Sequence, residues 1–242
     1  MSLFIHFKDI DLSQKTSFEG KKILSFDIDW ASDEVIQYTL DKVEKAGIKA
    51  TFFVTHHSPI LRVLEQHQLI ELGIHPNFNK LFEFDGYKGR FEDIFDELLT
   101  YVPNPIVTRS HCLTNSAKWH NYYISKGIKF SSNYMAYGQH QKPYSHVNGL
   151  IECPIHFADD GHLLVIENGE IDIPESLLLG KNHNGLSIYD FHPIHIAMNT
   201  PNPMSYENTR HLHKDFNKIM TKKCITYGVE SIFDKLITLN LV

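Results

Sequence analysis

The sequence has no long apolar run and no excess of positive charge. No stretch approaches the roughly 18 uninterrupted apolar residues of a membrane-spanning helix, and the first residues lack the basic and apolar regions of a secretory signal. We therefore expect no membrane span and a cytoplasmic location. The formal net charge of −6 argues against nucleic acid or a membrane surface as a partner, because proteins that bind these are usually basic.

Cysteine is also scarce. Cys112, Cys153 and Cys224 are scattered and form no Cys-x-x-Cys pair, which argues against a disulfide framework and fits a reducing compartment. Histidine, by contrast, occurs 16 times, and these residues are dispersed rather than gathered in one run. Several of them follow strand-like segments, where α/β proteins tend to place their chemistry.

Strand-like and helix-like patterns alternate along the chain. Residues 21–30 are apolar and β-like, and residues 32–47 carry apolar residues at helical spacing up to a glycine. This alternation predicts parallel strands joined by right-handed crossovers. No glycine-rich phosphate turn follows the first strand, which disfavours a dinucleotide-binding fold. We predict a single α/β domain over residues 1–242, a distorted (β/α) barrel of about seven parallel strands, with C-terminal helices over 205–240.

The expected strands are separated by helical patterns, except where a polar loop occupies residues 136–149. Seven segments are expected to form strands: 21–30, 48–55, 69–76, 104–113, 128–135, 150–157 and 186–194. In parallel barrels, functional side chains gather at the C-terminal ends of the strands. Five of the predicted ends carry ionisable groups: Asp27 and Asp29; His75; Arg109 and His111; His156, Asp159 and Asp160; Asp190, His192 and His195.

A single histidine at a strand end is usually structural, but five such ends together indicate a metal site or a proton-transfer site. Asp27 and Asp29 lie two residues apart, so both should point to the same face of a strand. Two buried like charges need a cation, a proton or hydrogen-bond donors. A metal on one aspartate would meet this need, and the other would deprotonate a metal-bound water. For this pair alone, backbone amides or Arg109 remain possible partners.

Several segments resemble the motifs of the polysaccharide deacetylases with a NodB-homology domain, carbohydrate esterase family four. The resemblance covers about residues 22–200 and keeps the motifs in the family's order. "SFDIDW" is similar to the first motif, and "KAGIKATFFV" to the strand after the first helix. The later motifs are matched by "ELGIHPNFN", "TRSH", "ECPIHFADD" and "DFHPIHI". The branch of closest resemblance is the WbmS-like one, which is associated with surface polysaccharides.

The resemblance implies a metal ligand set. Asp29 and His75 would be the first two ligands of a divalent metal, with zinc expected because aspartate and histidine suit it. The family's second motif has another histidine four residues after the first, but Asn79 stands at that position. His111 follows Arg109 by two residues and shares its strand face, so we expect His111 as the third ligand, with Asn79 as the alternative.

The resemblance also implies catalytic roles. Asp27 would be the general base beside Arg109, and His192 would be the general acid. Asp159 or Asp160 would orient His192, and Asp160 is predicted to belong to the catalytic residues. Three further residues are expected to bind substrate: Trp30, Asp190 and His195.

Together these features predict a metal-dependent hydrolase of a non-peptide C–N amide bond. The expected reaction is N-deacetylation of an amino sugar in surface-polysaccharide biosynthesis, with a saccharide or another small molecule as substrate. Two alternatives stay open: a non-catalytic saccharide-binding domain on the same fold, and a hydrolase of a small non-sugar amide. The oligomeric state is also open. No arginine–lysine cluster or glycine-rich phosphate cradle favours a phosphodiesterase.

Overall fold

The computed structural model describes residues 3–82, 88–165, 173–179 and 184–240. In these residues nine strands form one sheet, in the order β6-β7-β5-β4-β3-β2-β1-β9-β8. Neighbouring strands are parallel except for the antiparallel pair of β6 and β7. The strands are β1 Lys22–Asp27, β2 Ala50–Val54, β3 Ile70–Ile74, β4 Val107–Thr108, β5 Phe130–Ser131, β6 Tyr144–Ser145, β7 Ile151–Glu152, β8 Ile155–Ala158 and β9 Ser187–Phe191.

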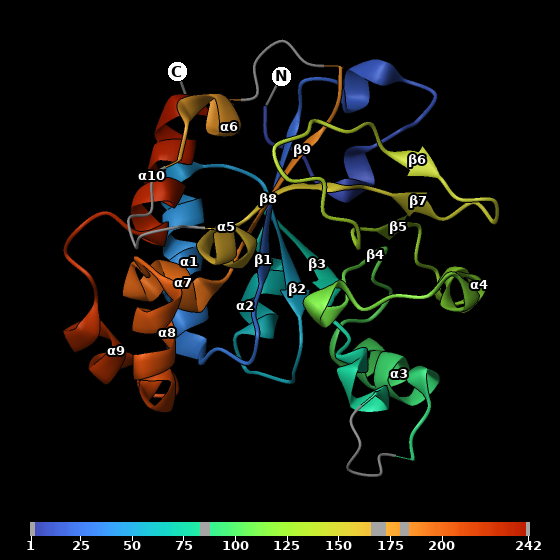
Figure 1. Cartoon of the computed structure of the whole chain (residues 1–242). Coiled ribbons are helices and arrows are strands. Elements are labelled where there is room, and N and C mark those ends of the chain that lie inside the picture. The colour runs from blue at the N-terminus through green and yellow to red at the C-terminus, as the bar shows by residue number, and fades with distance from the viewer. Residues whose placement is uncertain (1–2, 83–87, 166–172, 180–183, 241–242) are drawn as a thin grey trace.

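The sheet curls so that its two sides approach each other (Figure 1). A parallel bridge between Met135 and Ile155 links the chain just after β5 to β8, the strand at the far end of the order. The backbone N–H of Ile155 donates to the carbonyl oxygen of Tyr134, and that of Ala136 donates to the carbonyl oxygen of Ile155, both at 2.8 Å. The predicted α/β fold with a distorted, mostly parallel barrel is therefore confirmed.

The strand count differs from the prediction of about seven for two reasons. Residues 150–157 do not form one strand, because Pro154 has no N–H to donate to a ladder and separates β7 from β8. The predicted polar loop at 136–149 contains the short antiparallel strand β6. Apart from that strand, and with β7 and β8 counted together, seven parallel strands remain.

Helices cover the outside of the sheet. They are α1 Asp33–Ala46, α2 Leu61–Gln66, α3 Phe91–Tyr101, α4 His120–Ser125, α5 Asp159–Val165, α6 Glu175–Leu179, α7 Pro193–Met198, α8 Pro203–Thr209, α9 Phe216–Lys222 and α10 Val229–Asn240. Figure 1 shows α1, α7 and α10 together on one side of the sheet, with α3 and α4 on the other. Helix α1 ends at Gly47, whose φ of 63° is left-handed, as the helical pattern predicts.

The strands separate two apolar clusters, one inside the barrel and one between the sheet and the helices. Along β1, Ile23 belongs to the inner cluster, whereas Leu24 and Phe26 belong to the outer one. The N-terminal segment contributes Phe7 to the inner cluster, and its ring lies 5.9 Å from that of Phe53. This segment covers the barrel at the N-terminal ends of the strands, so the opposite end remains for a functional site.

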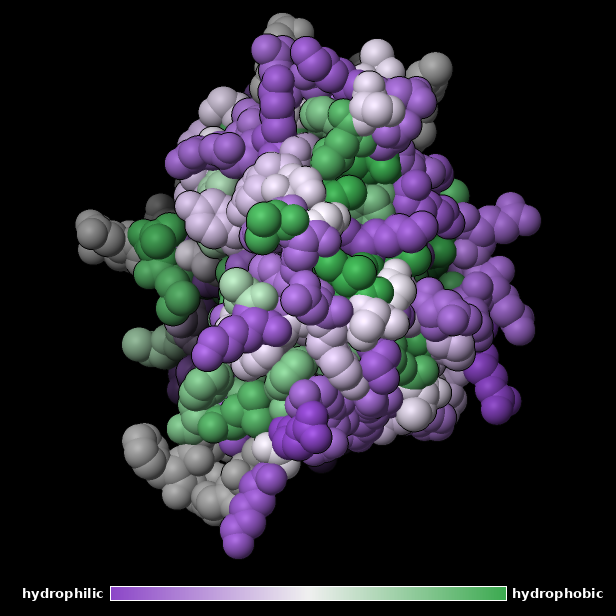
Figure 2. Space-filling model, turned by 90° about the vertical axis from the view of Figure 1, so that its right-hand side faces the viewer, coloured by the Kyte–Doolittle hydropathy of each residue, from purple (hydrophilic) through white to green (hydrophobic). Residues whose placement is uncertain are grey.

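Figure 2 shows the side of the molecule that carries α3, α4, β6 and β7. Hydrophilic side chains dominate this face, and apolar residues form separate patches among them. Within the described part of the chain, no helix combines the length and the apolar character needed to cross a membrane.

Candidate active site

A pocket of about 360 Å³ lies at the C-terminal ends of the strands. Its polar lining comes from segments that are far apart in the sequence but meet at this end of the barrel. The lining includes seven of the ionisable residues singled out from the strand ends: Asp27, Asp29, His75, His111, Asp160, Asp190 and His192. The structure therefore brings together most of the residues that the sequence pattern selects.

The first strand ends earlier than the sequence pattern predicts. β1 stops at Asp27, and Asp29 and Trp30 have left-handed φ angles of 35° and 56°. The prediction that Asp29 continues the strand is therefore wrong, although its carboxylate still lines the pocket. The turn is held by the N–H of Trp30, which donates to Oγ1 of Thr55 at 3.2 Å. Two adjacent non-glycine residues with positive φ are strained, a feature that clusters at functional sites.

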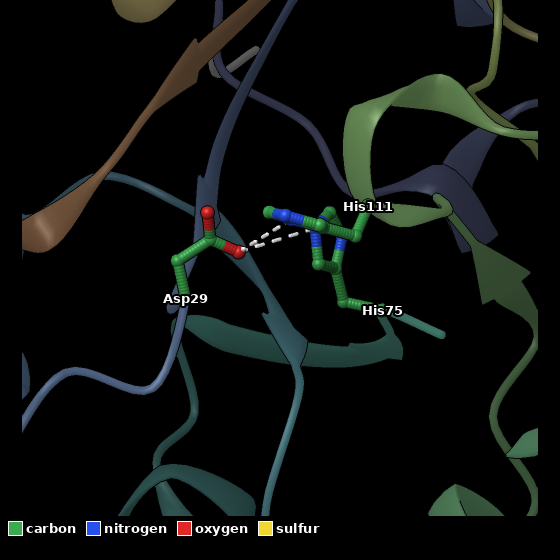
Figure 3. A group of neighbouring side chains, drawn as sticks. All are labelled: Asp29, His75 and His111. Carbon is green, nitrogen blue, oxygen red and sulfur yellow. Dashed lines mark ion pairs between the residues drawn. The ribbon is translucent and has the colours of Figure 1, made fainter. Parts of the chain in front are cut away.

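Asp29, His75 and His111 form a compact group (Figure 3). Oδ1 of Asp29 lies 3.3 Å from Nε2 of His75 and 3.2 Å from Nδ1 of His111. Nitrogen and oxygen ligands of tetrahedral zinc are about 3.3–3.5 Å from one another, so both distances suit a shared ion. Asn79 lies outside this group, and its Oδ1 instead accepts a hydrogen bond from Oγ1 of Thr114 at 2.6 Å.

The same group contains buried polar atoms without hydrogen-bond partners. Within the described residues, Oδ1 of Asp29 and both ring nitrogens of His75 have none. Buried polar atoms left in this way destabilise a fold unless something else binds them. Burial opposes ionisation of Asp29, but the contacts with His111 and His75 and the charge of His192 hold its pKa well below the usual range. An ionised carboxylate beside two imidazoles is a donor set that fits a divalent metal.

Beneath the pocket, a fully buried arginine connects two carboxylates. Nη1 of Arg109 donates to Oδ1 of Asp27 at 3.0 Å and to Oγ of Ser25 at 2.9 Å, and it lies 2.5 Å from Oδ1 of Asp190. Its Nη2 donates to Oγ of Ser132 at 3.0 Å. Burial opposes the charge, but the carboxylates of Asp190 and Asp27 raise the pKa of Arg109 above its usual value. Asp190 was expected to bind substrate, whereas its carboxylate is engaged by Arg109.

His192 is held by Asp159, one of the two aspartates expected to orient it. Oδ1 of Asp159 lies 2.7 Å from Nδ1 of His192, and Oδ2 accepts the backbone N–H of His192 at 2.8 Å. Of the two aspartates expected to orient His192, Asp159 therefore makes the contact, whereas Asp160 is exposed and its Oδ1 accepts from the N–H of Gly161. Burial disfavours the imidazolium, but the charge and hydrogen bond of Asp159 raise the pKa of His192 well above its usual value.

The other two predicted substrate-binding residues lie outside the pocket lining. His195 is buried behind His192, with Nδ1 lying 3.1 Å from Oγ1 of Thr200 and its ring 4.6 Å from that of Tyr206. Burial lowers the pKa of His195. This position does not suit contact with a substrate. Trp30 is 40% exposed, and its ring meets that of His111 edge-on at 5.1 Å, so it stands beside the candidate metal group.

A family model matches this sequence over residues 24–210, which include the whole of the site just described. The model is that of the WbmS-like polysaccharide deacetylases. The chain belongs to this family. The resemblance predicted from the motifs is therefore confirmed, and the membership supports a deacetylase. No curated protein matches the sequence.

Solved structures give the same relationship. The chain is 31% identical to WbmS of Bordetella bronchiseptica, assigned to the polysaccharide deacetylases and to O-antigen biosynthesis. The match covers 98% of both chains with a TM-score of 0.90. A polysaccharide deacetylase from Mycobacterium smegmatis shares 16% identity over 71% of this chain and 77% of its own, with a TM-score of 0.44. A peptidoglycan N-acetylglucosamine deacetylase shares 18% identity over 83% and 82%, with a TM-score of 0.43.

The sequence pattern does not single out the uncharged partners of Arg109. Ser25 lies inside β1 and Ser132 directly follows β5, so a search for ionisable strand ends passes over both. A signal for Ser25 exists, because it alternates with Asp27 and therefore faces the barrel interior with it.

Proposed function

We propose that the protein is a metal-dependent deacetylase that hydrolyses the N-acetyl amide of an amino sugar in surface-polysaccharide biosynthesis. One observation carries the proposal. The group of Asp29, His75 and His111, which contains buried polar atoms without hydrogen-bond partners, lines one pocket together with a carboxylate paired with Arg109 and a histidine paired with Asp159. The family and the likeness to WbmS support the saccharide as the substrate class.

The metal would be held by Asp29, His75 and His111, and zinc suits this donor set. When bound, such an ion supplies a Lewis acid for the acyl carbonyl and lowers the pKa of a coordinated water. Nε2 of His75 faces Asp29, whereas Nδ1 lies 3.6 Å from Oδ2 of Asp27. The imidazole of His75 thus stands between the ligand group and the carboxylate that we assign as the base.

Asp27 is the general base in this proposal. Arg109 and Asp27 are joined through Oδ1, which leaves Oδ2 toward the pocket to accept the proton of the attacking water. Arg109 also contacts Ser25, Ser132 and Asp190, which lie on or next to different strands. These contacts fix the guanidinium group and, through it, the orientation of the base.

His192 is the general acid. Its raised pKa favours the protonated imidazole, and Asp159 binds Nδ1, so Nε2 carries the proton available to a substrate. Nε2 lies 3.5 Å from Oδ2 of Asp29, on the pocket side. The water oxygen bonds to the acyl carbon, the C–N bond breaks, and His192 protonates the leaving nitrogen to give a free amine and acetate.

The test uses the full chain loaded with zinc, with acetate release from N-acetylated glucosamine oligosaccharides as the measurement. Asp27→Asn and His192→Ala should each lower kcat by about 10²–10⁴-fold. Asp27→Asn should keep its bound zinc, which separates a lost base from a lost metal. If both variants release acetate at the wild-type rate, the assigned roles are wrong. If the wild type binds the saccharide without a stoichiometric metal and without turnover, a non-catalytic binding domain is the correct function.

The third ligand is tested by a matched pair. His111→Ala should weaken zinc binding by at least about tenfold, because it removes one of three protein ligands. Asn79→Ala should leave zinc affinity within about twofold, because Asn79 contacts Thr114 rather than the ligand group. Competition with a chromophoric chelator measures both affinities. The reverse result would assign the third position to Asn79.

A further inference from the structure

The pocket has two kinds of lining. The segments at and after the ends of β1, β3, β4 and β9 contribute the imidazoles and three of the carboxylates described above, and the fourth carboxylate, that of Asp160, comes from α5. Apart from Ser110 and Cys112, the rest of the lining is apolar and comes from the turn after β4, the segment after β5, strand β8 and helix α5. We call it the acyl wall: Leu113, Met135, Ile155, Ala158, Gly161 and Leu164.

The acyl wall runs from the protein interior to solvent. Ile155 and Ala158 at one end are 0% and 2% exposed, whereas Leu164 at the other is 79% exposed. A sugar ring pressed against the buried end would lose the water hydrogen bonds of its hydroxyl groups without replacement. An alkyl group would gain from burial at the same place. The acyl part of an N-acyl sugar therefore suits the wall, and the ring suits the open side.

Gly161 limits how far this wall reaches into the pocket. A Cβ atom there would meet Cε of Met135 at 3.7 Å and Cβ of Ala158 at 3.8 Å, which are ordinary contacts. Packing therefore does not require glycine at this position, although glycine weakens a helix relative to alanine. Gly161 and His192 line the same pocket, and the absence of a side chain at Gly161 leaves space inside it.

We propose that the acyl wall binds the alkyl part of N-acyl groups longer than acetyl, and that Gly161 sets the length accepted. The inference rests on the proposed hydrolysis of N-acetyl amides and extends its substrate class to N-propionyl and N-butyryl amides of amino sugars. A pocket of about 360 Å³ is within the range that holds whole drug-sized ligands, so an acetyl group fills only part of it. The reaction is unchanged: water supplies the hydroxyl of the carboxylic acid and the proton of the amine.

The first experiment compares the zinc-loaded full chain on N-acetyl-, N-propionyl- and N-butyryl-D-glucosamine, with free amine as the readout. Each methylene buried on the wall should raise kcat/KM about fourfold, which gives the N-butyryl substrate about a tenfold advantage or more. A wild type that cleaves the N-butyryl substrate no better than the N-acetyl one would overturn the inference but not the proposed function. Release from none of the three substrates, with acetate still released from the N-acetylated oligosaccharides, would also overturn the inference alone, and release from none of these compounds would overturn both.

The second experiment uses a matched pair on α5. Leu164 and Val165 are both exposed, at 79% and 63%, but only Leu164 lines the pocket. Leu164→Ala should lower the N-butyryl to N-acetyl ratio of kcat/KM at least about threefold, because it removes apolar contact area. Val165→Ala should leave that ratio unchanged. Equal ratios in both variants and the wild type would overturn the inference.

Gly161 is tested by filling the space. Gly161→Ala and Gly161→Val should lower kcat/KM for the N-butyryl substrate progressively, and more than for the N-acetyl substrate. Gly161→Ala should also keep or raise the Tm, because its Cβ has room and alanine favours a helix. A Gly161→Ala variant that folds with that Tm and shows the wild-type chain-length preference would remove Gly161 from the proposal.

Discussion

Two buried ionisable side chains, one on strand β3 and one directly after it, differ in how their polar atoms are satisfied. Glu71, near the start of the strand, is 7% exposed, and its carboxylate accepts from the N–H of Phe7 at 2.9 Å, the N–H of Lys8 at 3.2 Å and Oγ1 of Thr51 at 3.1 Å. His75, just after the strand, is 2% exposed, and neither ring nitrogen has a hydrogen-bond partner within the described residues.

The difference separates a structural group from a ligand-binding one. Both residues are buried at the same depth, so burial alone does not distinguish them. At the N-terminal end of the barrel, the chain itself supplies every donor that Glu71 needs. At the C-terminal end, His75 and Asp29 present atoms that the described chain does not satisfy. Each buried atom without a partner needs an explanation, and here three such atoms lie on two neighbouring side chains of one pocket, where a bound ion would supply it.

The strongest test of this distinction concerns the arginine between the two ends. Arg109 is buried and fully paired, so it should act as a structural group as well as a catalytic one. Arg109→Met leaves Asp27 and Asp190 buried without their cation, and should lower the free energy of unfolding by about 3–5 kcal/mol. Urea denaturation with zinc removed measures this change.

The control for Arg109 is an arginine on the surface. Arg90 also pairs with a carboxylate, that of Glu92 at 2.6 Å, but it is exposed to solvent. Arg90→Met should leave the free energy of unfolding unchanged within error, because exposed pairs contribute little. If Arg109→Met were equally harmless, the buried cluster would not hold the barrel together.

The next test makes His75 apolar. His75→Phe removes two unsatisfied nitrogens, so the metal-free protein should keep or gain stability, by up to about 1–3 kcal/mol. The variant should also lose its response to zinc. Wild type should gain about 2.7 kcal/mol at a zinc concentration of 100 times Kd, and Asn79→Ala should gain the same. A large loss of stability in metal-free His75→Phe would show that His75 is structural after all.

Glu71 should behave in the opposite way. In Glu71→Gln, an NH₂ group replaces one of the two oxygens that accept backbone N–H donors, which should lower the free energy of unfolding by about 1–3 kcal/mol. The gain in stability on adding zinc should remain as in wild type. A variant with normal stability but a weakened zinc response would contradict the assignment of Glu71 to the fold.

The pH dependence of the same variant gives a second readout. Burial raises the pKa of Glu71 above its ordinary value, against the opposing hydrogen bonds from Lys8, Phe7 and Thr51. Between the ordinary and the raised pKa, the folded state therefore holds more protons than the unfolded one. Glu71 then makes wild type lose stability as pH rises through that interval. Glu71→Gln should lack this contribution, which urea denaturation at a series of pH values measures.

The sequence predicts the architecture and the polar residues of the pocket because both follow from periodicity. The spacing in β1 places Asp27 inside the barrel, and the helical pattern ends correctly at Gly47. Features that depend on single backbone angles could not be predicted in this way. Asp29 and Trp30 take left-handed conformations, which aspartate visits only occasionally and tryptophan rarely, so their surroundings must impose these angles.

The sequence pattern also could not decide which of two candidate residues makes a given contact. Asp159 and Asp160 are chemically identical, and which one meets His192 depends on where β8 ends and α5 begins. His111 and Asn79 were separated by the distance to Asp29, a tertiary quantity with no local signature. The sequence thus predicts which residues gather at the strand ends, whereas their pairing depends on boundaries known only to within a few residues.

The smallest expected effect concerns Asp160, which lies on the pocket but is exposed to solvent. Asp160→Asn should change kcat less than about threefold, because the hydrogen bond from the N–H of Gly161 survives with an amide oxygen. Asp159→Asn is the matched comparison, and it should lower kcat by about 10–100-fold with little change in KM, since it weakens a charged hydrogen bond to His192. Steady-state kinetics on the N-acetyl substrate measures both. Equal losses of kcat in the two variants would mean that negative charge near the pocket, and not the contact of Asp159 with Nδ1, supports His192. The hydrogen-bond partners of Asp159 would then not explain its role.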